Sequence, residues 1–106
     1  ALIARLNAAL GKLRSHDARA VFVSMPTAGA MAETENRLFP REEYWDVFAK
    51  GIEAPAVNCR DEADLAKFVP PDGSHLTSGQ AVEFSHALGR VLVTVLSEKA
   101  EPSASR

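Results

Sequence analysis

The continuous apolar run Ala20–Met25 most restricts what this chain can fold into. It contains β-branched and aromatic residues and ends at Pro26. A continuous run, unlike an alternating one, is typical of a strand buried on both faces, as in a parallel sheet. A second and weaker run, Pro55–Arg60, predicts another short strand. These two runs favour an α/β fold with parallel strands.

Helical patterns alternate with the two predicted strands. Apolar residues at helical spacing predict an amphipathic helix that runs to about Ser15. Further helices are expected over Phe39–Gly51, over Asp61–Phe68, where a turn is the alternative, and most clearly over Gln80–Leu96. Alternation of this kind is typical of an α/β layer. The 106 residues suffice for one domain, which we place at residues 1–96, followed by a flexible tail at 97–106.

Two strands alone make a poor sheet, so we expect them to form the edge of a larger one. The chain also opens with Ala1-Leu2-Ile3, inside a helical pattern and without a cap. Both features lead us to expect further sequence upstream.

Two segments are candidates for lining a pocket. Residues Thr27–Arg37 follow the first strand, carry no clear period and are predicted to be a loop. Loops at this end of a parallel strand commonly carry binding groups. In the next helix, Tyr44, Val47 and Phe48 form one apolar stripe, and Trp45 lies off it. We therefore expect residues Thr27–Leu38 and the side chain of Trp45 to be candidates for lining a pocket. For the aromatic residues, the alternative is a place in the core.

Composition excludes several classes of function. Hydrophobic content is 46% and charged content 25%, as in globular domains. A net charge of −2 gives no basic surface to neutralise phosphates, which disfavours nucleic-acid binding. No apolar run is long enough to cross a bilayer, and no signal peptide opens the chain. Cys59 is the one cysteine, so neither an intrachain disulfide nor a cysteine-based zinc site can form.

The segment that carries recognisable chemistry is Asp72-Gly73-Ser74-His75. Gly73 tolerates the positive φ of a tight turn. Thr77 and Gln80 have the spacing of a capping box, which places His75 in the loop just before the last helix. An Asp that orients a His, and a His that moves a proton, form half of a nucleophilic triad. The alternative is an ordinary surface loop, because short motifs match by chance.

The segment Phe68–Leu76, followed by Gly79 and a long helix, resembles the last conserved block of the SGNH (GDSL-type) hydrolase superfamily. The apolar strand that ends at Pro26 resembles the penultimate core strand of that superfamily. The most similar branch is acyltransferase-like, the type of alginate O-acetyltransferases and D-alanyl-transfer helper proteins. The resemblance spans about Arg19–Leu96. It implies the C-terminal portion of a three-layer α/β/α, flavodoxin-like SGNH fold, with an extracytoplasmic location.

The resemblance also implies roles for two residues. His75 would be the general base that takes the proton of a serine hydroxyl, and Asp72 would hold its imidazole in the correct tautomer. The Gly-Asp-Ser nucleophile block and the oxyanion Gly and Asn blocks are absent from this sequence, and Ser24, Ser74 and Ser78 are not assigned as nucleophile. We expect the serine to come from an upstream part of the same polypeptide or from a second chain. The expected substrate is an acyl ester, possibly of a carbohydrate, and this chain alone should hydrolyse none.

Two other functions compete with this one. A non-catalytic binding or structural module would keep the scaffold and the loop without the chemistry. A metal site is disfavoured, because its possible ligands lack the spacing of a known site, and no cofactor is expected. Those ligands are His16, Cys59, Asp72, His75 and His86. A Gly-Asp-Ser block in the parent reading frame would separate the enzyme from the binding module.

Overall fold

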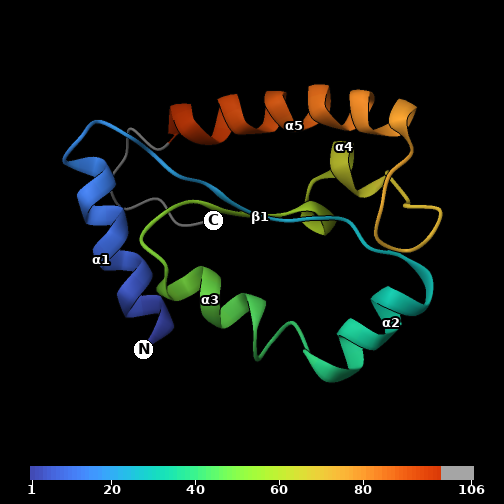
Figure 1. The fold of residues 1–106 in the computed structure, drawn as a ribbon, viewed down its shortest axis with the longest axis horizontal. Coiled ribbons are helices and arrows are strands. Elements are labelled where there is room, and N and C mark those ends of the chain that lie inside the picture. The colour runs from blue at the N-terminus through green and yellow to red at the C-terminus, as the bar shows by residue number, and fades with distance from the viewer. Residues whose placement is uncertain (99–106) are drawn as a thin grey trace.

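The computed structural model describes residues 1–98 as a mixed α/β arrangement (Figure 1). In chain order the elements are α1 (Leu2–Arg14), β1 (Phe22–Ser24), α2 (Gly29–Leu38), α3 (Trp45–Gly51), β2 (Ala56–Asn58), the 3₁₀ turn η1 (Cys59–Asp61), α4 (Ala63–Ala66) and α5 (Ser78–Glu98). The predicted order of helices and strands is confirmed, with one additional helix, α2.

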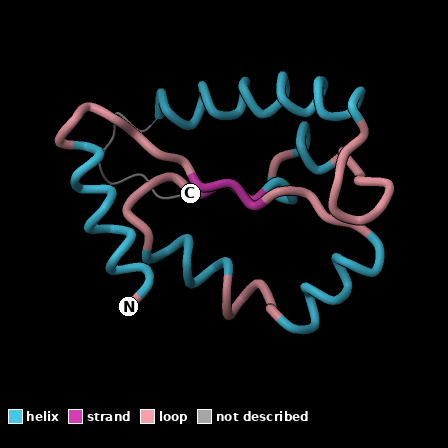
Figure 2. Tube along the Cα trace, viewed as in Figure 1, coloured by secondary structure: helices cyan, strands magenta, loops and turns pink. Residues whose placement is uncertain are grey.

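The two strands pair in parallel, as the sequence predicted. They lie at the centre of the molecule, shown in magenta in Figure 2. Phe22 lies opposite Ala56, and Ser24 lies opposite Asn58. The expectation that the first strand is buried on both faces is wrong, because β1 is half-buried along its length. The weaker run, β2, is instead buried throughout. Burial of a strand depends on what covers its edges as well as its faces, and composition does not report the edges.

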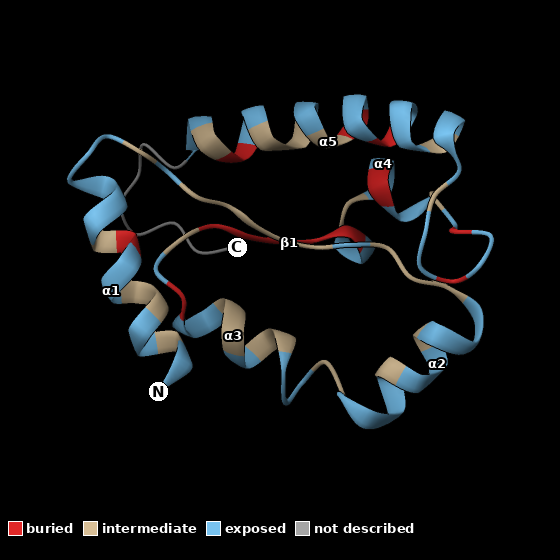
Figure 3. Cartoon of the chain, viewed as in Figure 1, coloured by how far each residue is buried: buried red, intermediate tan, exposed pale blue. Residues whose placement is uncertain are grey.

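Helices cover both faces of the sheet (Figure 3). On one face α5 and α4 pack on Val57 and Val23, and on the other α1 and α3 pack on Ala56 and Phe22. Successive strand residues point to opposite faces, so each strand contributes to both clusters. The α5-side cluster has as its buried members Val57, Cys59, Leu65, Phe84, Ala87 and Val95. The α1-side cluster has as its buried members Leu10, Ile52 and Ala56.

The segment predicted as a loop over Thr27–Arg37 is largely helical, which corrects that prediction. Helix α2 spans Gly29–Leu38 and buries none of its residues. Its Ala, Met and Glu residues favour helix intrinsically. The amphipathic pattern of α2 is as strong as that of α1, so the expectation of no clear period is also wrong, and the prediction of a loop rested on the small and polar composition of the segment.

The predicted helix over Phe39–Gly51 is shorter than expected. Residues 41–44 form a turn, and α3 begins at Trp45. The prediction that Tyr44 and Val47 belong to an apolar stripe facing the core is wrong, because they are 51% and 53% exposed. Trp45 instead packs against Phe48 in the α1-side cluster, with ring centroids 5.8 Å apart. The core alternative for Trp45 is therefore correct.

An arginine fork holds this turn against η1. The guanidinium of Arg41 donates to both carboxylate oxygens of Asp61, at 2.8 and 2.6 Å, and its Nε donates to Asp46 at 3.1 Å. The hydrogen bonds from Arg41 lower the pKa of the Asp61 carboxyl. The bidentate contact fixes the orientation of the turn as well as its position.

Helix α5 confirms the clearest of the predicted helices. It spans Ser78–Glu98 and buries Phe84, Ala87 and Val95. Ser97 and Glu98, which were assigned to the tail, belong to this helix, and the remainder of the predicted tail lies outside the described residues. Among the helices of residues 1–98, none has the length and apolar character to cross a membrane.

Candidate active site

The loop that carries Asp72 and His75 is anchored where it joins α5. The backbone N–H of Thr77 donates to Oε1 of Gln80 at 2.9 Å, and the Gln80 N–H donates to Oγ1 of Thr77 at 3.1 Å. This is the predicted capping box. The Gln80 amide also donates to the Val69 carbonyl at 3.1 Å, across the base of the loop. The loop is therefore closed by one glutamine side chain.

Gly73 lets the middle of the loop dock on the start of α2. It is buried, has a φ of +92° and accepts a hydrogen bond from the Ala28 N–H at 3.0 Å. A Cβ at this position would lie 2.9 Å from the Ala28 carbonyl oxygen. Both the backbone conformation and the close approach require glycine.

Asp72 is fixed by the backbone that follows it. Its Oδ1 accepts from the N–H groups of Ser74 and His75, at 3.0 and 2.7 Å. These two backbone bonds, followed by the His75 side chain, lower the pKa of the Asp72 carboxyl to about 2. Hydrogen bonds to the charged form explain this direction. Asp72 is thus ionised at neutral pH.

The second carboxylate oxygen of Asp72 orients the His75 ring. Oδ2 lies 2.9 Å from Nδ1 of His75. An ionised carboxylate only accepts hydrogen bonds, so Nδ1 carries the proton. In the neutral ring Nε2 then holds the lone pair that accepts a proton. The loop therefore holds the His75 ring in one orientation against Asp72, while the catalytic role of the two residues stays a prediction.

This pair is open to solvent. The side chains of His75 and Asp72 are 81% and 59% exposed. Ser74 Oγ also lies 2.9 Å from His75, but on the same Nδ1 that faces Asp72. In the described part of the chain no serine hydroxyl is bonded to Nε2. Within the described residues, Nε2 of His75 is therefore accessible to a group from outside the loop.

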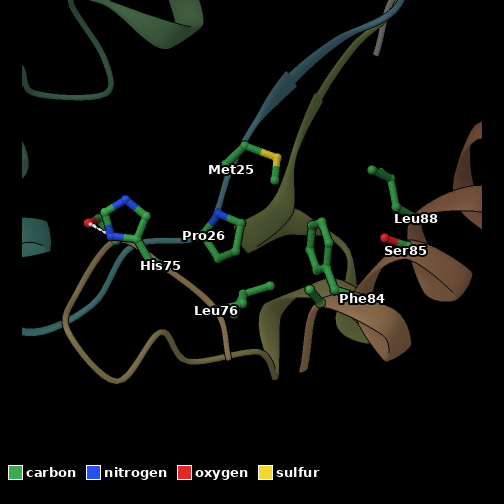
Figure 4. A pocket seen from close by; sticks show the side chains of 9 residues that line it. Met25, Pro26, His75, Leu76, Phe84, Ser85 and Leu88 are labelled. Atoms are coloured by element: carbon green, nitrogen blue, oxygen red, sulfur yellow. Dashed lines mark hydrogen bonds between the residues drawn. The ribbon is translucent and has the colours of Figure 1, made fainter. Parts of the chain in front are cut away.

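A pocket of about 380 Å³ lies beside His75. Its walls come from the carboxyl end of β1, from the loop and from the first turns of α5 (Figure 4). The apolar lining residues are Met25, Pro26, Leu76, Ala81, Phe84 and Leu88. The polar lining residues are Ser74, His75 and Ser85.

The pocket differs from the one expected from the sequence. Neither the segment Thr27–Leu38 nor Trp45 is among its lining residues. Ser85 also lines it, although no motif in the sequence marks this residue. Figure 4 shows His75 and Ser85 at opposite ends, with Pro26 between them, so we do not assign Ser85 as a partner of His75.

The other titratable candidates lie elsewhere. His16 is exposed and bonded through Nδ1 to the Lys12 carbonyl at 2.9 Å. His86 is exposed on α5. Cys59 is buried, and desolvation raises the pKa of its thiol to about 11. Over residues 1–98, no three His, Cys, Asp or Glu side chains gather as a metal site would require.

Comparison of the chain with protein-family models, with curated proteins and with solved structures finds no match. The chemistry of the loop is therefore inferred from its own geometry.

Proposed function

We propose that this chain is the base-carrying C-terminal part of an SGNH-like acyl-ester hydrolase or O-acyltransferase. One observation carries the proposal. Nδ1 of His75 lies 2.9 Å from Oδ2 of Asp72, whose other oxygen is fixed by two backbone N–H groups. An ionised carboxylate that fixes the tautomer of a histidine is the support that a general base needs.

The reaction would follow from the position of the lone pair on Nε2. A serine hydroxyl from outside this chain would give its proton to Nε2 of His75 while its oxygen bonds to the ester carbonyl carbon. The bond to the alcohol then breaks, and His75 returns the proton to the leaving oxygen. Water or an acceptor hydroxyl releases the acyl group in the second half. Asp72 would stabilise the imidazolium in both halves.

The nucleophile would come from an upstream part of the polypeptide or from a second chain, docked at the outer edge of β1. The Phe22 N–H bonds to the Pro55 carbonyl at 2.9 Å, toward β2. Because polar groups alternate along a strand, those of Val23 point to the other edge. Added strands there would extend the sheet between its two helical layers into the three-layer, flavodoxin-like fold.

The test is ester turnover by the natural full-length gene product. We expect it to hydrolyse a p-nitrophenyl acyl ester, and His75→Ala to lower kcat by roughly 10⁶-fold. His86→Ala, at the exposed histidine of α5, is the matched control and should retain turnover. Equal turnover in the wild type and in His75→Ala would exclude the proposed role of His75.

A second candidate is a non-catalytic binding module. The observation that favours it is the 81% exposure of the His75 side chain, with no hydroxyl bonded to Nε2 in the described residues. This candidate predicts a full-length product that lacks a Gly-Asp-Ser block and turns over no ester. Its Asp72–His75 contact would nevertheless persist.

A further inference from the structure

The pocket beside His75 has a chemistry that the proposed reaction leaves unassigned. Its volume of about 380 Å³ lies within the range of small-molecule sites, roughly 300–1,000 Å³, and it is an open groove, not an enclosed cavity. Met25 and Pro26 form one wall, and Leu76, Phe84 and Leu88 form most of the remainder. Figure 4 shows these side chains along the space between His75 and Ser85. The pocket therefore extends away from the base over a mostly hydrocarbon surface.

The polar groups of the pocket are few. Apart from His75, they are the side chains of Ser74 and Ser85, and no Asp, Glu, Lys or Arg lines the pocket among residues 1–98. A sugar or a peptide requires several directed partners, because a polar group that leaves water without one costs free energy. A hydrocarbon chain requires none and gains free energy with each methylene removed from water.

We propose, building on the proposed function, that this pocket binds the hydrocarbon chain of the ester substrate. The ester carbonyl would lie at the His75 end, and the chain would run along Pro26 and Leu76 toward Ser85. The site would then select esters of medium-length chains over the carbohydrate acetyl esters that the resemblance suggests. An acyl chain and an alcohol chain share this chemistry, so the experiment compares both.

The probes are acetate, butanoate, hexanoate, octanoate, 1-octanol and methyl glucoside, each titrated into the ¹⁵N-labelled natural full-length gene product. We expect affinity to rise about two- to fourfold with each added methylene, with amide shifts at Leu76, Ala81 and Ser85. Tighter binding of octanoate than of octanol assigns the acyl chain, and the reverse assigns the alcohol chain. Octanoate and octanol that both bind no better than acetate, or methyl glucoside that binds better than either, would overturn the proposal.

A matched pair of substitutions on α5 tests the location. Ala81→Phe fills the pocket from its exposed rim and should weaken octanoate binding by at least about tenfold. Val82→Phe changes the next residue, which is 59% exposed and does not line the pocket, and should leave the affinity unchanged. An equal effect of the two variants would place the chain elsewhere and refute the assignment.

The hydrocarbon site and the proposed reaction can each be excluded without excluding the other. If the full-length product bound octanoate but turned over no ester, the proposed reaction would be excluded and the pocket would still be a site for hydrocarbon chains. Turnover of acetyl esters without binding of octanoate or octanol would retain the reaction and remove the hydrocarbon site.

Discussion

Asp72 is the residue whose electrostatics most affect the candidate site. Its carboxylate accepts hydrogen bonds from the backbone N–H groups of Ser74 and His75 and from the His75 ring. All three stabilise the charged form, although the side chain is exposed. Local backbone geometry, rather than burial, therefore keeps this carboxylate ionised.

We predict that Asp72 titrates with a pKa of about 2 in the native chain, below its ordinary value of 3.8. A lowered folded pKa means that the hydrogen bonds stabilise the loop fully above about pH 3.8 and are lost as pH falls toward 2. A ¹³C carboxyl titration by NMR measures this, with Asp72→Asn to identify the signal. A midpoint at or above 3.8 would contradict the described hydrogen bonds.

Cys59 shows the opposite case, in which burial sets the pKa. The residue is 1% exposed, and desolvation raises the pKa of its thiol from 9.0 to about 11. The thiolate fraction at pH 8 is then about a hundredfold lower than at an ordinary site. We expect the native chain to react with a thiol reagent at least that much more slowly than the chain in urea. Equal rates in buffer and in urea would show that Cys59 is accessible.

At the scale of elements, the site depends on contacts between segments distant in sequence. The loop is held to α5 by the Thr77 and Gln80 cap and to the start of α2 by Gly73. Helix α2 has no buried residue of its own, so this contact helps to hold it in place. The loop and α2 therefore support each other.

Gly73→Ala should disrupt this contact. The added methyl would meet the Ala28 carbonyl oxygen at 2.9 Å, and alanine is strained at a φ of +92°. We expect a loss of about 1–3 kcal/mol of unfolding free energy in urea, with shifted amide signals at Asp72 and His75.

The control for that experiment is Gly89→Ala in α5, where an added methyl meets no atom within 4 Å. It should stabilise the chain by about 0.5–1 kcal/mol, because alanine favours helix. If both variants changed the free energy of unfolding in the same direction, the close approach at Gly73 would not be what distinguishes that position.

At the scale of the whole molecule, the two clusters are coupled through the sheet. Both strands place residues on both faces, since Val57 lies in the α5-side cluster and Ala56 in the α1-side cluster. Neither helical layer can therefore lose its packing without affecting the strands that support the other. We expect residues 1–98 to unfold in one transition.

Leu65→Ala tests this coupling. Leu65 is fully buried in the α5-side cluster, so its truncation should cost about 2–5 kcal/mol. Trp45, the one tryptophan, reports on the α1-side cluster. Its fluorescence transition in urea should shift together with the circular dichroism. Val93→Ala, at a position 67% exposed on α5, is the control and should change stability by less than about 0.5 kcal/mol. Separate transitions by the two probes would refute the coupling.

The sequence by itself determined the features that depend on short-range chemistry. The cap at Thr77, the turn at Gly73 and the contact between Asp72 and His75 each form within a few residues, so their spacing predicts them. Helices α1 and α5 were predictable because each buries a face, which leaves a period in the sequence. The parallel strands were predictable from continuous apolar runs, although their burial was not.

Only the tertiary structure decided which segments meet. Helix α2 escaped prediction because its small and polar residues are typical of a loop, although its amphipathic pattern is as strong as that of α1. The pocket brings Met25 and Pro26, which directly follow β1, to Phe84 of α5, and no spacing in the sequence connects them. Trp45 joined the core because it lies three residues before Phe48, on the face of α3 that packs in the α1-side cluster. Hydrogen bonds between near residues are fixed by local geometry, whereas the walls of a pocket depend on packing between distant elements, which a single sequence does not report.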